Sequence, residues 1–121
     1  MKKLLITTAF IFAYAPNAMA NNEHQKAIKI ITDVITAAIV AEIECKTATA
    51  NSDFSKHVLD GFNVTNDERI EIRKDMELRQ GIFYKQMAHE GKDNWCSRMV
   101  SNLIKPIDGY APLIPNQNKG Q

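Results

Sequence analysis

The first twenty residues have the pattern of a secretory signal peptide, which sets both the length of the mature chain and its chemical environment. Two lysines precede a largely apolar run from Leu4 to Ala15, and Ala18-Met19-Ala20 supplies the small residues of a cleavage site. The apolar run of about 12 residues is shorter than the roughly 20 that a membrane-spanning helix needs. We therefore expect residues 1–20 to be removed, the mature chain to start at Asn21, and the protein to be periplasmic or secreted.

Removal of this segment leaves about 100 residues, enough for one domain but close to the size at which a hydrophobic core alone is marginal. The full chain carries 15 basic and 14 acidic residues, and the removed segment includes two of the lysines, so the mature chain is close to neutral. Nucleic acid and anionic lipid are bound through basic patches. We therefore expect no nucleic-acid partner and no stable membrane insertion after cleavage.

Cys45 and Cys96 are the only cysteines of the chain. An even cysteine count in a small exported protein indicates a disulfide, and two cysteines allow a single intramolecular pairing. In the chain-entropy account, a bridge that closes a loop of about 50 residues stabilises the fold by roughly 4 kcal/mol. A thiol-redox pair and a metal site are the alternatives, but no C-x-x-C spacing occurs and no histidine lies near either cysteine in sequence. The sequence therefore predicts a structural Cys45–Cys96 disulfide.

Apolar spacing predicts a long first helix from Glu23 to about Ala48, with Asn21 or Asn22 as its cap. One line of apolar residues runs along the predicted helix, and further apolar residues beside this main line, among them Ile35 and Ile39, widen the apolar stripe of the helix. A helix with so wide a stripe must be largely buried or must meet partners on two sides. The residues of the main line follow a 4-3-4-3-4 spacing: Ala27, Ile31, Val34, Ala38, Ala41 and Cys45.

A second long helix is predicted to run from the segment Thr65–Glu68 to about Glu90. Thr65 and Glu68 have the capping-box spacing, in which each side chain accepts a hydrogen bond from the backbone of the other residue. Gly81 inside this helix costs about 1 kcal/mol relative to alanine, which suggests a kink or a close helix crossing there. The expected inner residues are Ile72, Met76, Phe83 and Met87.

Two shorter helices complete the predicted set. Asp53 is expected to cap a helix over Phe54–Asp60, and Asp93 is expected to cap a last helix that ends at Lys105-Pro106. The fold class is therefore predicted to be all-α: a small bundle of three to four helices, two of them long, with one disulfide.

The helical domain is expected to span residues 21–106. Residues 107–121 contain two glycines, two prolines and several amides, a composition typical of a flexible or extended tail.

Candidate catalytic and metal-binding groups are sparse. None of the three histidines has a second histidine at i+3 or i+4, and His57 with Asp60 is the nearest approach to a ligand pair. Glu42, near the end of an apolar helix, is the nearest approach to the acid of a small envelope hydrolase. Both cysteines are expected to be oxidised, and no G-x-S-x-G motif occurs. We expect no enzymatic activity, no cofactor and no bound metal.

Protein contact is the class of function that remains. Tryptophan packs in cores and is also enriched at interfaces, and apolar residues between prolines can join the groove or sheet edge of a partner. The candidate partner-binding residues are Ile35, Ile39, Trp95, Tyr110 and Leu113.

The expected partner is an envelope protein or a second copy of this chain. The protein would then be an accessory factor of an envelope-spanning conjugation or secretion complex, or an inhibitor or immunity protein. An acid-stress periplasmic chaperone and a small envelope hydrolase are the alternatives.

Overall fold

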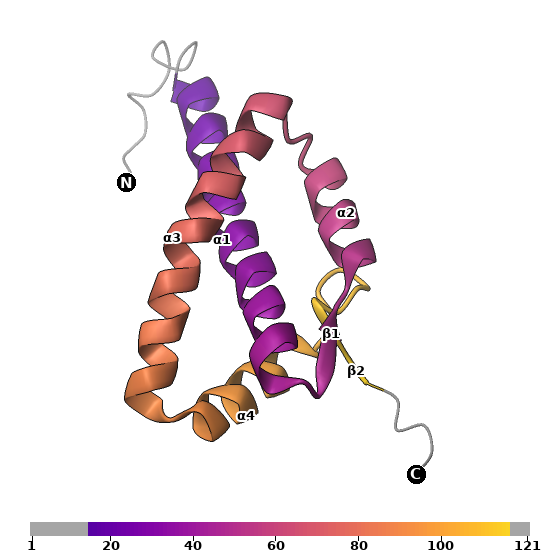
Figure 1. Ribbon diagram of the computed structural model, residues 1–121. Helices are drawn as coiled ribbons and strands as arrows, with labels where there is room; N and C mark the ends of the chain where they lie inside the picture. The colour runs from indigo at the N-terminus through magenta and orange to yellow at the C-terminus, as the bar shows by residue number, and fades with distance from the viewer. Residues whose placement is uncertain (1–14, 117–121) are drawn as a thin grey trace, which may run out of the picture. The chain divides into compact units, whose positions relative to one another are not determined.

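The computed structural model describes the backbone of residues 15–116 and the side chains from Asn22 to Asn116 (Figure 1). This part of the chain is mostly helical, with four helices and a two-stranded sheet. The all-α bundle expected from the sequence is therefore confirmed, with the addition of the sheet. The elements are α1 (Ala15–Cys45), β1 (Ala48–Ala50), α2 (Ser52–Gly61), α3 (Asn66–Glu90), α4 (Lys92–Leu103) and β2 (Leu113–Pro115).

The chain divides into two compact units, residues 1–30 and residues 31–121, and α1 runs through both. Most of the expected signal peptide, residues 1–14, lies outside the described residues. Because α1 begins at Ala15, the predicted cleavage site and Asn21 and Asn22 fall inside this helix, so neither asparagine caps it. Cleavage after Ala20 would remove the first residues of α1.

The buried face of α1 in the second unit has the width that the apolar spacing predicted. Val40 and Ala41 are fully buried, and Ile31 and Ile35 are nearly so. The buried hydroxyl of Thr36 donates a hydrogen bond of 2.6 Å to the carbonyl oxygen of Thr32, which satisfies a polar group inside this face. The remaining buried residues on this stretch are Thr32, Ala37 and Ala38.

The first helix ends earlier than predicted. It stops at Cys45 rather than near Ala48, and Lys46 follows with a φ of 62°, a left-handed conformation that cannot continue a right-handed helix. The next residues, Ala48–Ala50, are extended and form β1.

Of the caps predicted for the three later helices, two are wrong and one is confirmed. The side chain of Asn51, not of Asp53, caps α2 by accepting a hydrogen bond from the Asp53 backbone, and α2 therefore begins at Ser52. The capping box of Thr65 and Glu68 is present at the start of α3, with both reciprocal hydrogen bonds formed. The third predicted cap, Asp93, lies in the first turn of α4, whose cap position is occupied by Gly91.

Gly91 joins α3 to α4 in a single-residue connection. It ends one helix, precedes the next, and has a φ of 93°, which favours glycine because a Cβ is strained there. Gly81 behaves differently from the prediction: it is exposed, and α3 is continuous through it. A Cβ built at Gly81 would meet no atom within 4 Å, so no close helix crossing accounts for this glycine.

The segment expected to be a flexible tail contains a strand that the sequence analysis did not predict. Leu113–Pro115 pairs antiparallel with Ala48–Ala50, with Thr49 opposite Ile114. Leu113 is fully buried, and the Asn51 backbone N–H donates to the Pro112 carbonyl oxygen over 2.9 Å. Residues 117–121 lie outside the described part of the chain.

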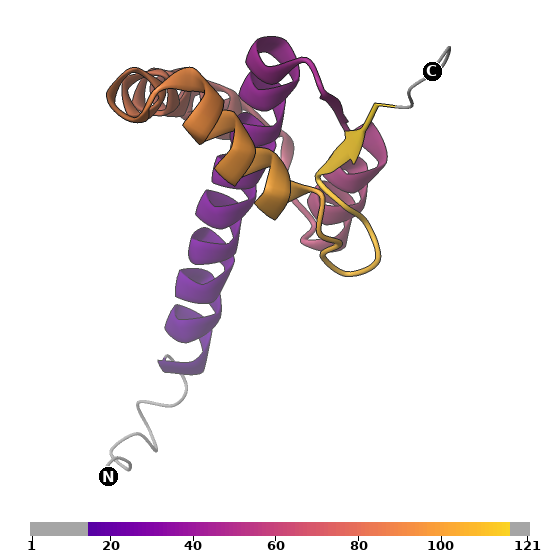
Figure 2. The same ribbon diagram turned by 90° about the horizontal axis from the view of Figure 1, so that it is seen from below.

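Two apolar clusters form the core of the second unit. The larger brings together α1, α3, α4 and both strands. Its Trp95 has no exposed surface and makes an edge-on contact to Phe83. The smaller packs Ile31 and Ile35 of α1 against α2. Figure 2 shows α4 lying across the C-terminal part of α1. The inner residues predicted for α3 are correct: Ile72, Phe83 and Met87 are buried, and Met76 packs on the smaller cluster.

Candidate functional site

The candidate partner-binding residues are divided between the core and the surface. Trp95 and Leu113 have no exposed surface and Ile35 is 8% exposed, so all three serve as packing residues of the folded domain. Ile39 is partly buried against the smaller apolar cluster. Tyr110 alone keeps a substantial exposed fraction, 39%. The structure therefore packs every candidate except Tyr110 into or against the core, and the five candidate residues do not form one surface.

The two cysteines are bonded, as predicted. The Cys45–Cys96 disulfide joins the end of α1 to the first turns of α4, with a Cα–Cα distance of 5.6 Å. No free cysteine is found among the described residues, and the sequence contains no other cysteine.

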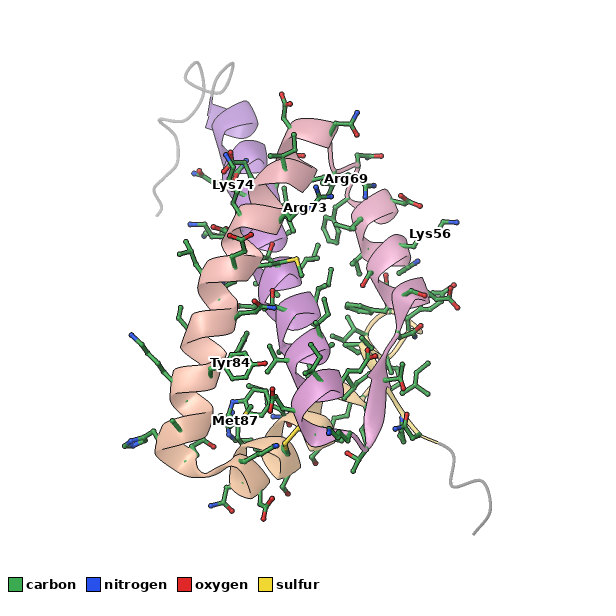
Figure 3. All side chains as sticks on the ribbon, viewed as in Figure 1. Lys56, Arg69, Arg73, Lys74, Tyr84 and Met87 are labelled. Atoms are coloured by element: carbon green, nitrogen blue, oxygen red, sulfur yellow. A yellow bond between two sulfur atoms is a disulfide. The ribbon has the colours of Figure 1, made fainter. Side chains whose placement is uncertain are left out.

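Beside the bridge, Glu44 accepts a hydrogen bond from the Tyr84 hydroxyl over 2.9 Å and lies 3.5 Å from the Lys92 ammonium. Figure 3 shows Tyr84 directed from α3 toward α1. Partial burial raises the pKa of Tyr84, and the hydrogen bond to Glu44 and the charge of that carboxylate raise the pKa further. The tyrosine therefore remains a neutral hydrogen-bond donor at ordinary pH, which suits a tie between two helices.

His57 is linked to the loop before β2 rather than to Asp60. Its Nε2 lies 3.3 Å from an Asp108 carboxylate oxygen, and its ring stacks on Tyr110 at a centroid distance of 4.5 Å. Asp60 instead pairs with Arg69 of α3 over 3.4 Å. The ligand pair considered from the sequence is thus replaced by two separate surface contacts, and a surface ion pair such as Asp60–Arg69 contributes about 0–1 kcal/mol.

Glu42, the carboxylate considered as a hydrolase acid, makes a contact that holds two elements of the fold together. Glu42 accepts a hydrogen bond of 2.9 Å from the Ala50 backbone N–H and so ties β1 to α1. Over the described residues, no group of three or more histidine, cysteine, aspartate or glutamate side chains is arranged to hold a metal ion.

An open apolar groove of about 420 Å³ lies between α1, α3 and α4. Its walls are mostly aliphatic and aromatic, and it lies entirely within the second unit. Pockets of this size, with an apolar lining and a few polar groups, are the usual form of a binding site. The lining residues are Asp33, Val34, Ala37, Arg79, Ile82, Phe83, Gln86, Met99 and Leu103.

The polar groups of the groove are paired with one another or with the core. Arg79 donates a hydrogen bond to Asp33, so the charged part of the lining is electrically balanced. Gln86 accepts a hydrogen bond of 3.4 Å from the indole N–H of Trp95, a fully buried core residue that also contacts Phe83 of the lining. The groove therefore offers an occupant an apolar contact with no net charge.

Sequence reasoning did not find this groove, because its walls come from three segments whose relative placement no local pattern specifies. A signal for the ordered loop before β2 was present, however. Asp108-Gly109 is a dipeptide typical of tight hairpin turns, and Ile107 and Tyr110 exchange both backbone hydrogen bonds around it. Asp108 and Gly109 have φ angles of 57° and 90°, as such a turn requires.

The fold and the groove define a small disulfide-bonded helical protein with an open, mostly apolar groove on its surface. Comparison with known proteins adds no relative: no family model, no curated protein and no solved structure matches the chain. In the described range, no helix combines the length and the apolar character needed to span a bilayer.

Proposed function

We propose that this chain is an exported protein of the periplasm, or a secreted one, that acts by binding another envelope protein. Its role would be that of an accessory factor of an envelope-spanning conjugation or secretion complex, or of an inhibitor or immunity protein. The observation that carries the proposal is the apolar groove between α1, α3 and α4. The disulfide supports the expected oxidising compartment.

The occupant proposed for the groove is an amphipathic helix of the partner. A groove bordered by helices, with a mostly apolar lining and three polar residues, suits a helix that presents apolar residues at i, i+3, i+4 and i+7. Because Asp33 and Arg79 neutralise each other, the apolar face of that helix needs no compensating charge. The partly buried Met99 adds an adaptable contact, since methionine fills irregular gaps.

Site-specific photocrosslinking in intact cells tests this proposal. A photoreactive amino acid replaces Met99 in the full-length chain, and a matched probe replaces Lys56, which points away from the bundle on α2 (Figure 3). We expect the Met99 probe to give one dominant adduct, mapped to a helical segment of an envelope protein, and the Lys56 probe to give none.

A synthetic peptide of the mapped segment should then bind the purified protein. Met99→Lys should weaken this binding at least about tenfold, because it places a charge in an apolar groove. Equal labelling from both probes, or binding indifferent to Met99→Lys, would contradict the proposal. So would an adduct with a second copy of this chain that persists after Leu78→Glu, a substitution on the exposed side of α3 outside the groove.

A further inference from the structure

The outer face of α3 carries a second surface beside the groove, with which it shares one residue, Ile82. Six of its residues follow a 4-3-4-3-4 spacing, which is the 3.5-residue repeat of a coiled-coil contact line. The two central residues are apolar and strongly exposed: Leu78 by 70% and Ile82 by 53%. These six residues are called the α3 stripe: Glu71, Asp75, Leu78, Ile82, Lys85 and His89.

Charge along the α3 stripe changes sign from one end to the other. The two residues on the N-terminal side are acidic, and the two on the C-terminal side are a lysine and a histidine. Within the described part of the chain, neither Asp75 nor Lys85 forms an ion pair. The stripe therefore presents an acidic end, an apolar centre and a basic end, and its charges at Asp75 and Lys85 are not used internally.

We propose that the α3 stripe is a homodimer contact, in which α3 of a second copy lies antiparallel to the first. A two-fold axis midway between Leu78 and Ile82 places each of these residues against the other in the second copy. The same axis places Asp75 opposite Lys85 of the second copy and Glu71 opposite His89 of the second copy. Every stripe residue then meets a complementary one, and the contact is the same on both chains, as a two-fold interface requires.

The charge order selects antiparallel over parallel pairing. Parallel helices in register would place Asp75 against Asp75 and Lys85 against Lys85, which costs energy, whereas the antiparallel arrangement makes four contacts between acidic and basic residues. Leu78 and Ile82 supply the apolar burial that such a contact needs, since their exposed surface has no cover within the described chain.

This inference goes beyond the proposed function and does not depend on it. The α3 stripe lies beside the groove on the surface of α3 and shares only Ile82 with its lining. Substitutions at Asp75, Leu78 and Lys85 therefore test the dimer without altering the groove, and Met99→Lys tests the groove without altering the stripe.

Sedimentation analysis of the disulfide-bonded mature protein, over a concentration series up to about 100 μM in about 50 mM salt, measures the association. We expect a reversible dimer. Asp75→Lys alone and Lys85→Glu alone should each raise the dimer Kd at least about tenfold, because each creates two like-charge contacts. An equimolar mixture of the two variants should recover a heterodimer, and the double variant Asp75→Lys/Lys85→Glu should recover the homodimer.

Leu78→Glu should abolish the dimer, whereas Ile70→Glu should leave it intact. Ile70 is the matched control, because it is also an exposed apolar residue of α3, by 50%, but lies off the stripe. Circular dichroism verifies that the variants keep their helices. A monomer at every concentration, a Kd unchanged by Asp75→Lys, or equal effects of Leu78→Glu and Ile70→Glu would overturn the proposal.

Discussion

Gly81 lies on the exposed side of α3 and makes no contact that requires a glycine. A Cβ at this position would be in open space, and the helix continues through it without interruption. The local cost is the conformational freedom that glycine loses in a helix, about 1 kcal/mol relative to alanine. Gly91 is the opposite case, since its φ of 93° is one that other residues avoid.

Gly81→Ala should therefore raise the free energy of unfolding by about 0.5–1 kcal/mol. Gly91→Ala is the control and should lower it by about 1 kcal/mol or more, because alanine is strained at that φ. Urea denaturation measures both, in a Leu78→Glu background that separates folding from association. A destabilised Gly81→Ala variant would show that packing against this glycine exists in solution.

At the scale of secondary structure, local sequence patterns predicted the features that depend on residues close together in the sequence. The capping box of Thr65 and the inner face of α3 were predicted because both depend on spacings of three or four residues. The sheet was not predicted, because two three-residue strands pair across more than sixty positions of the chain. The groove was missed for the same reason: Val34, Phe83 and Met99 meet only through the packing of three helices.

Two adjacent residues of β2 that differ in burial test whether this strand contributes to the stability of the core. Leu113 is fully buried, and Ile114 is 47% exposed. Leu113→Ala should cost about 2–5 kcal/mol of unfolding free energy, the usual range for a buried leucine, and Ile114→Ala about 0.5 kcal/mol. Thermal or urea unfolding measures both. Equal midpoints for the two variants would mean that β2 does not contribute to the core.

At the scale of the whole molecule, compartment and stability are connected through the bridge. In the chain-entropy account, the bridge between Cys45 and Cys96 closes a loop of 51 positions and stabilises the fold by roughly 4 kcal/mol. That gain is comparable to the net stability of a small domain, and it is available only where disulfides persist.

The intact mass of the protein purified from the cell envelope or the medium should correspond to residues 21–121 less two hydrogens. Alkylation should label no thiol before reduction and two afterwards, because export and oxidation go together. A mass that includes residues 1–20, or two thiols that react without reductant, would contradict the proposed export.

The elements that complete the disulfide and the sheet come late in the sequence. The partner of Cys45 is in α4, and the strand that completes the sheet, with its buried Leu113, comes later still. Until these residues have been synthesised, α1 lacks part of its apolar cover, namely Trp95, Leu103 and Leu113 of the larger cluster. In a reducing cytoplasm the bridge is missing as well. If the chain is exported as proposed, we expect its precursor to stay loosely structured and competent for threading through a translocation channel, and to reach its native state only after its last segments have crossed.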